Sequence, residues 1–336
     1  MTKKFFLLFL LISLNGNAQN IFKYEKEIKQ KKEYNFIEIG FFNSIDEIKL
    51  SGTLIEPQKD YDKIIVIIPG STEDTRHSHF ILAEELLKNG IAVYRFDERG
   101  IAKSEGSYTD SETKLSQDLS SLFKKLKTSY KDKKIGFVGH SRGGMASLEM
   151  IQNGLNPTFL VLIGTPVLKN GNYILNRIEK DIQNNPSIIE KGKTEEETIE
   201  LFGDMFKILA DNSNSKDMKE QTKELLDRKG FSRKYLKFLK DFMNDDVFME
   251  LVRKDYQTVI NDLSIPTLYF VGSDDAILNA KLESDYIKSF QNEFIEVKIF
   301  EDLNHYLTEK NAPIGTSLYK MDKAPLNKII TWTLKK

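Results

Sequence analysis

The feature that most limits how this chain folds is a regular alternation between short apolar runs and segments of helical periodicity. The clearest run is 63–68, KIIVII, which is apolar after its lysine and ends at Pro69-Gly70. Continuous runs of this length are typical of strands buried on both faces of a parallel sheet. Similar patterns predict strands at 91–96, 135–138, 158–163, 267–271 and 294–300, and helices at 80–88, 115–126, 142–152, 281–289 and 323–333. This alternation predicts an α/β fold, a mostly parallel sheet flanked by helices.

The alternation stops at about residue 170 and resumes at about residue 260. The stretch between is rich in Lys, Glu, Asp and Asn, with apolar residues at helical spacing, and it predicts a helical cap insertion. The predicted parts are an extension at 19–34, the core at 35–169, the insertion at 170–260, and the rest of the core at 261–336. Phe206, Met243 and Met249 of the insertion are candidates to line an acyl pocket, but a place in the insertion's own core is favoured.

The core is expected to open with an antiparallel pair of strands at 35–42 and 48–55.

The N-terminus has the pattern of a secretory signal peptide. Lys3 and Lys4 precede a short apolar run at 5–14, and small and polar residues follow it. A bilayer span needs about 20 apolar residues, and this run is about half that length. We therefore expect a signal peptide at 1–18, cleaved after Ala18, and a secreted or periplasmic protein without a stable membrane anchor. An uncleaved anchor is the alternative.

Composition excludes several classes of function. The chain has 49 basic and 50 acidic residues, a net charge of -1, so no basic excess points to nucleic acid. It has no cysteine, which excludes disulfides, thiol nucleophiles and zinc-thiolate sites. No phosphate-binding loop, dinucleotide fingerprint or zinc-protease motif occurs in the sequence. We predict no metal and no organic cofactor.

A candidate nucleophile lies in Gly139-His140-Ser141-Arg142-Gly143, a G-x-S-x-G motif. The motif alone is weakly specific, but here it directly follows a predicted strand and opens a predicted helix. That context is typical of a nucleophile elbow, a sharp turn that exposes the serine hydroxyl at the carboxyl edge of the sheet. Side chains two residues either side of the serine would collide with backbone, so glycine is required there.

A serine hydroxyl needs a base, and His305 is the only histidine after Ser141. It follows the last predicted strand, in the chain order nucleophile, acid, base that this kind of elbow uses. The acid should follow the preceding strand, where Asp274 and Asp275 are adjacent. We favour Asp275, and we interpret Asp274 as a turn or capping residue.

Two backbone N–H groups should stabilise the developing oxyanion. We expect them from Arg142, the residue after the nucleophile, and from Ser71 in the loop after 63–68, with Thr72 as the next choice. His77 and His79 further along this loop are interpreted as solvated, although they could line the pocket entrance.

The turn Asp97-Glu98-Arg99-Gly100 is interpreted as structural, with an aspartate and an arginine that can pair and brace a neighbouring loop.

Together these motifs resemble the α/β-hydrolase superfamily, and more narrowly bacterial esterases close to the serine aminopeptidase group. The resemblance runs from about Leu50 to Trp332. It is carried by Ser51-Gly52-Thr53-Leu54, Pro69-Gly70-Ser71, the segments 95–100, 104–106 and 139–144, Gly272 to Asp275, and Leu303-Asn304-His305. It implies an α/β-hydrolase fold and a carboxylesterase-like enzyme that acts on a small-molecule ester through an acyl-enzyme, with Ser141, Asp275 and His305 as the triad. One departure is Ala102, where the family usually has a glycine.

Two other functions are open from the sequence. A periplasmic aminopeptidase or dipeptidyl peptidase would use the same triad, and acids binding a substrate ammonium would favour it. Glu195-Glu196-Glu197 is such a cluster, but a solvated helix face is the simpler interpretation. A non-catalytic binding protein is the third, and an intact triad argues against it. The sequence assigns no oligomeric state and no acyl chain length.

Overall fold

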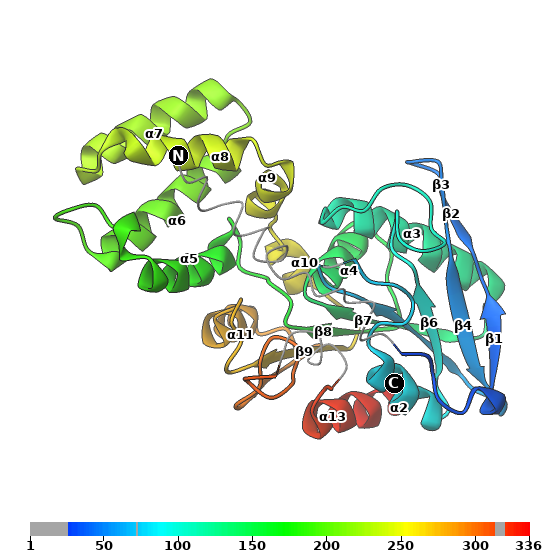
Figure 1. Cartoon of the computed structure of the whole chain (residues 1–336). Helices are drawn as coiled ribbons and strands as arrows, with labels where there is room; N and C mark the ends of the chain where they lie inside the picture. The colour runs from blue at the N-terminus through cyan, green and yellow to red at the C-terminus, as the bar shows by residue number, and fades with distance from the viewer. Residues whose placement is uncertain (1–25, 72, 313–319) are drawn as a thin grey trace. The chain divides into compact units, whose positions relative to one another are not determined.

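The computed structural model describes residues 26–71, 73–312 and 320–336, so the predicted signal peptide lies outside the described residues. The chain forms two compact units (Figure 1). The described residues up to Pro166, together with Thr258–Asp275 and Ala280–Lys336, form the larger one. The smaller one contains Val167–Gln257 and Ala276–Asn279. No helix in the described ranges is both long and apolar enough to cross a membrane.

An eight-stranded sheet organises the larger unit, in the order β1-β4-β6-β5-β7-β8-β9-β10. Its strands are β1 (Tyr34–Glu38), β4 (Gly52–Pro57), β5 (Lys63–Ile68), β6 (Ala92–Phe96), β7 (Lys134–His140), β8 (Phe159–Ile163), β9 (Thr267–Gly272) and β10 (Ile295–Phe300). In the sheet order, each strand from β6 to β10 pairs in parallel with the next one, whereas β4 pairs antiparallel with both β1 and β6. The predicted mostly parallel sheet is confirmed.

The opening pair of strands is more divided than we predicted. Each apolar run splits in two, so that β1 pairs with β4, while β2 (Phe41–Asn43) and β3 (Ile48–Leu50) form a separate hairpin. A hairpin turn follows β2, where the Asn43 side chain accepts hydrogen bonds from the N–H groups of Ile45 and Asp46. This turn depends on a polar side chain, and a prediction from the spacing of apolar residues does not include it.

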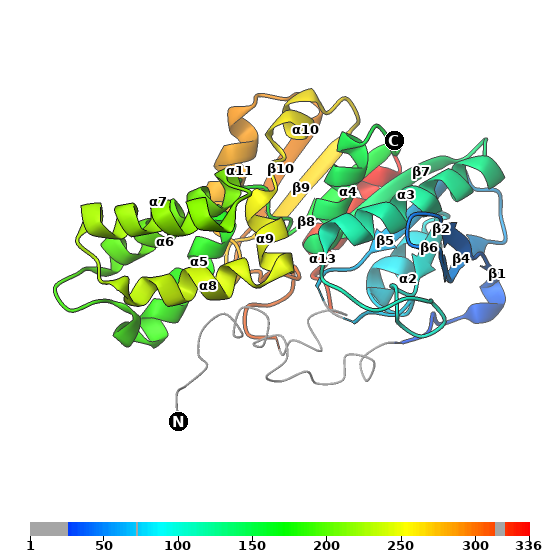
Figure 2. The ribbon, with the colours of Figure 1, turned by 90° about the horizontal axis from the view of Figure 1, so that it is seen from above.

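Five helices of the larger unit match predicted segments: α2 (Phe80–Lys88), α3 (Glu112–Ser129), α4 (Arg142–Gln152), α11 (Ala280–Ser289) and α13 (Lys323–Thr333). A short helix, α10 (Gln257–Asp262), leads back to β9. The apolar faces of α2 and α13 share one buried core with the sheet, including Leu86, Ile330 and Trp332. Figures 1 and 2 show α3 and α4 side by side, and Figure 1 shows α2 and α13 away from them. The sheet is therefore flanked by helices, as predicted.

The insertion follows β8 and precedes β9, the sixth and seventh strands of the large sheet. It is built from α5 (Asn172–Asn184), α6 (Glu195–Asp211), α7 (Ser215–Lys229), α8 (Leu236–Met243) and α9 (Asp246–Arg253). Phe206 and Met249 belong to its own buried core, and Met243 packs against that core. In the smaller unit Phe206 and Met249 are thus core residues, and Met243 lies at the edge of that core.

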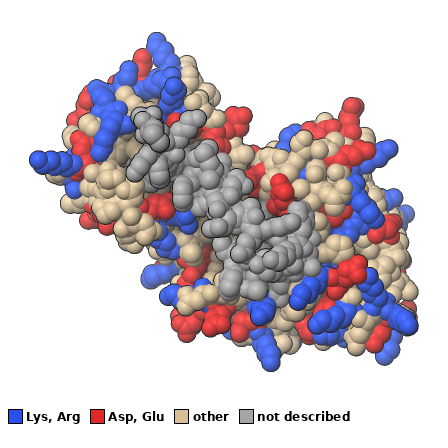
Figure 3. Space-filling model, viewed as in Figure 1, with Lys and Arg blue, Asp and Glu red and all other residues tan. Residues whose placement is uncertain are grey.

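The three glutamates at 195–197 form the first turn of α6. Thr194 caps this helix, and its side chain and that of Glu197 bind each other's backbone N–H groups in a capping box. Glu195 and Glu196 line a pocket of the smaller unit with Glu179, Gln183, Ile199 and Glu200. Carboxylates at a helix N-terminus are stabilised by the helix dipole, which explains this cluster without a ligand. On the face in Figure 3, acidic and basic side chains both occur over each unit.

Candidate active site

Ser141 occupies the turn between β7 and α4 with φ 51 and ψ -119, a positive φ that non-glycine residues rarely adopt. A Cβ on Gly139 would lie 2.7 Å from the backbone of Gly144, and one on Gly143 would lie 2.4 Å from the Pro69 carbonyl oxygen. Both glycines of the motif are therefore required by close backbone approach. The Ser141 side chain is only half-buried, as an exposed nucleophile requires.

The structure brings His305 to Asp275. The Nδ1 of His305 and Oδ2 of Asp275 are 2.7 Å apart, in loops that follow β10 and β9. Because an ionised carboxylate only accepts hydrogen bonds, this contact keeps the proton on Nδ1 and leaves the Nε2 lone pair free. Asp274 instead forms an ion pair with Lys310 at 2.5 Å. The two adjacent aspartates thus have different partners.

Ser141 follows β7, which β8 separates from β9 in the sheet, and it is not hydrogen-bonded to His305. Its N–H donates to the Ile163 carbonyl at 2.8 Å, and a Cβ on the next residue, Gly164, would lie 3.0 Å from His305 Nδ1. Within the described ranges, the buried Nε2 of His305 has no hydrogen-bond partner. In enzymes without substrate such hydrogen bonds are often open and form when substrate binds.

The His305 loop is held by two side chains to which the sequence reasoning gave no role. Asn304 Oδ1 accepts hydrogen bonds from the N–H groups of Tyr306 at 2.9 Å and Thr308 at 3.2 Å. The Nε2 of His140 is 3.2 Å from the carbonyl oxygen of His305. In the sequence Asn304 appeared only as part of the Leu-Asn-His motif. Asparagine is common in turns, so its presence there did not indicate that it holds the His305 loop.

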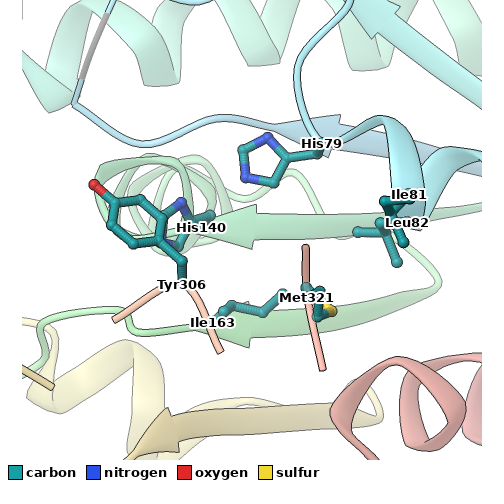
Figure 4. A pocket seen from close by; sticks show the side chains of 7 residues that line it. All are labelled: His79, Ile81, Leu82, His140, Ile163, Tyr306 and Met321. Atoms are coloured by element: carbon teal, nitrogen blue, oxygen red, sulfur yellow. The ribbon is translucent and has the colours of Figure 1, made fainter. Parts of the chain in front are cut away.

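His79, His140 and Tyr306 line one small pocket with four apolar side chains (Figure 4). The ring centroid of His140 lies 5.4 Å from that of His79 and 5.1 Å from that of His305. Burial, and the neighbouring His305 and His79, lower the pKa of His140 well below its usual range. His140 is therefore neutral near pH 7, and its Nε2–H donates to the His305 carbonyl.

Our interpretation of His79 as solvated is wrong: it is 7% exposed, whereas His77 is half-buried. The reason is that His79 directly precedes α2 as its N-cap residue, and the apolar face of this helix packs into the core. Burial, with a smaller contribution from Arg95, lowers the pKa of His79 to about 4.

The buried His79 should make stability depend on pH. Its pKa falls from 6.5 to about 4 on folding, so below pH 6.5 the unfolded chain binds the extra proton. Stability therefore decreases as the pH falls from about 7 to 4. Between pH 7 and 5 this residue should account for about 2 kcal/mol of lost unfolding free energy.

Urea unfolding of wild type and His79→Asn at both pH values measures this contribution. Asparagine is chosen because it tolerates the left-handed backbone at this position, φ 50. The free-energy difference between the two proteins should shrink by about 2 kcal/mol at pH 5. An unchanged difference would contradict a neutral, buried His79.

The turn after β6 is structural, as predicted, but its pairing is not. Asp97 binds Arg76 in the loop after β5, with the closest atoms 2.7 Å apart, and Arg99 binds Asp118 on α3 at 2.8 Å. The expectation that this aspartate and arginine pair with each other is therefore wrong. Ala102, where the family usually has glycine, takes the left-handed φ of 47 that a glycine favours.

One of the two residues chosen as oxyanion donors adjoins Ser141, and the other follows a glycine that packs against it. Arg142 follows it directly, and Ser71 follows Gly70, on which a Cβ would lie 3.3 Å from the Ser141 Cβ. The alternative, Thr72, lies outside the described residues. The carboxyl edge of the sheet thus gathers the candidate nucleophile, acid, base and oxyanion residues, all within the larger unit.

Comparisons with known proteins identify the family and the fold. A family profile described as "Serine aminopeptidase, S33" matches residues 59–311. An esterase from Pyrococcus furiosus has a similar structure, with 17% identity, a TM-score of 0.58, and coverage of 93% of this chain and 95% of that one. An esterase from Exiguobacterium antarcticum matches with 13% identity, a TM-score of 0.52, and coverage of 88% and 98%. No curated protein sequence matches. At these identities the solved structures establish the fold alone, which is the α/β-hydrolase fold.

Proposed function

Because the chain belongs to the serine aminopeptidase family of α/β hydrolases, we propose that it is a serine hydrolase that cleaves small carboxylic esters through an acyl-enzyme. The observation that carries the proposal is the Asp275–His305 hydrogen bond of 2.7 Å at the sheet edge where the strained turn presents Ser141. Ser141 would be the nucleophile, His305 the base and Asp275 the acid. The esterases among the similar structures support an ester substrate.

The placement of these groups supports the following reaction. His305 Nε2 takes the Ser141 proton as Oγ attacks the carbonyl carbon, while Asp275 stabilises the resulting imidazolium. The N–H groups of Ser71 and Arg142 hold the oxyanion of the tetrahedral intermediate. The imidazolium then protonates the departing alcohol and leaves an acyl group on Ser141. Water, deprotonated by His305, attacks that ester and releases the carboxylic acid.

Location and processing are part of the proposal. The signal pattern at 1–18 supports export to the periplasm or beyond and a mature chain that begins at Gln19.

Labelling with a fluorophosphonate tests the serine mechanism. The native protein should take one equivalent, and peptide mapping should place the adduct on Ser141, because only an activated hydroxyl reacts at a useful rate. Protein unfolded in urea is the control and should stay unlabelled. Absence of label in the native protein, or label on another serine, would refute the mechanism.

Hydrolysis assays then distinguish ester from peptide chemistry. We expect turnover of p-nitrophenyl acetate, butyrate and octanoate to exceed that of aminoacyl-p-nitroanilides. Turnover of the anilides alone would favour a peptidase.

A further inference from the structure

The side chain of Arg142 is buried behind the turn that holds Ser141, with 2% of its surface exposed. Its Nη1 donates to the Thr109 carbonyl at 2.6 Å and its Nη2 to the Gly70 carbonyl at 3.1 Å. It also forms an ion pair with Glu98, which is 1% exposed. One guanidinium thus ties together the loop after β5, the turn after β6 and the segment that leads to α3.

The contact with Gly70 has a direct geometric consequence. The Gly70 carbonyl and the Ser71 N–H belong to one peptide group, and the described peptide bonds are trans. In a planar trans peptide the N–H points opposite to the carbonyl. The Ser71 N–H therefore points away from the Arg142 guanidinium, and a Cβ on Gly70 would lie 3.3 Å from the Ser141 Cβ.

We propose that the Arg142 side chain is a positioning residue that locks the orientation of the Gly70–Ser71 peptide, so that the Ser71 N–H faces the oxyanion formed on Ser141. The inference rests on the proposed function. Arg142 then serves the site twice, through its own main-chain N–H and through a side chain that fixes the second donor.

A reversal of this peptide would be harmful to catalysis. Without a donor on the Gly70 carbonyl, rotation of the peptide would turn the carbonyl dipole towards the oxyanion and the N–H away from it. A planar guanidinium can hold the peptide in one orientation because it binds two carbonyls and a carboxylate at once and keeps its charge at any ordinary pH.

Glu98 compensates the buried charge of Arg142, so the test must change both residues. Removing one member of a buried ion pair leaves the other unpaired, which destabilises a protein whatever its function. Both members are therefore neutralised, as Arg142→Met with Glu98→Gln. Burial raises the pKa of Glu98, so a neutral side chain is less costly there than at an exposed position.

A matched control pair lies on the same turn. Arg99 and Asp118 are 8% and 1% exposed and form a buried ion pair, but no hydrogen bond of this pair reaches Gly70 or Ser141 within the described ranges. The double substitution Arg99→Met with Asp118→Asn removes equivalent buried charges. It should lower the melting temperature without altering the oxyanion site.

The readout is the pKa of the hemiketal that a trifluoromethyl ketone forms with Ser141, followed by ¹⁹F NMR, beside kcat and KM for p-nitrophenyl butyrate. In the Arg142/Glu98 variant we expect kcat to fall by about 10²- to 10³-fold. The hemiketal pKa should rise by about two to three units for the same loss of oxyanion stabilisation. KM should change little. Arg142→Lys, which cannot reproduce the planar fork, should give an intermediate loss.

Three outcomes overturn the inference. The first is an unchanged hemiketal pKa and kcat in a folded Arg142/Glu98 double variant. If that variant fails to fold, the same result in a folded Arg142→Lys variant counts instead. The second is an equal loss in the Arg99/Asp118 control, which would show a general packing effect. The third is a wild type that forms neither the hemiketal nor the fluorophosphonate adduct, in which case the proposed function fails as well.

Discussion

Replacing Ser141 with alanine is expected to lower kcat for p-nitrophenyl butyrate by about six orders of magnitude. The alanine removes the only atom that can form the acyl-enzyme, and the remaining rate would come from the oxyanion donors and substrate binding. KM should change little, because the hydroxyl contributes mainly in the transition state. The fold should be retained, since the substitution removes one half-buried oxygen atom.

The measurement is steady-state hydrolysis beside circular dichroism of the purified variant. Ser120→Ala on α3, which removes a hydroxyl bound to the carbonyl of Ser116, is the control and should keep wild-type activity. If Ser141→Ala retained activity within tenfold of wild type, Ser141 would not be the nucleophile.

Asp275→Asn is expected to lower kcat by about 10⁴-fold. The asparagine can donate its amide N–H to Nδ1 of His305, which moves the imidazole proton to Nε2, the atom that must accept the Ser141 proton. The effect would thus come from the wrong tautomer rather than from a displaced histidine. The loss should appear in kcat and in kcat/KM together.

The neighbouring Asp274 provides the matched control. Asp274→Asn breaks only the ion pair with the exposed Lys310, and exposed pairs contribute roughly 0–1 kcal/mol. Its activity should therefore equal that of wild type. Equal losses in the two variants, or a loss confined to Asp274→Asn, would contradict the assignment of the acid.

The larger part of the fold was predictable from the sequence. Strand β5 and helices α2, α4 and α13 begin and end where the apolar patterns indicate. Burial imposes a period of two or 3.6 residues on neighbours in the chain, so the signal is local and can be read without a structure. The glycines around Ser141 were predictable for a similar reason, because the sharp turn itself brings backbone close to Gly139 and Gly143.

The partners of the polar residues were decided by the tertiary structure. Asp275 rather than Asp274 binds His305, and Asp97 binds Arg76 rather than Arg99. In these two cases the partners are 30 and 21 residues apart in the chain. Such contacts exist only because loops from different strands converge at one edge of the sheet.

The same reason explains two further features of the site that the sequence did not indicate. The burial of His79 depends on where α2 packs, and the hydrogen bond from Arg142 to Gly70 depends on how the loop after β5 meets the start of α4. Periodicity determined the layers of this protein and the turn that bears its candidate nucleophile. The tertiary structure alone determined the hydrogen-bond partners and the buried charges, because hydrogen bonding depends on distance in space and not on separation in the chain.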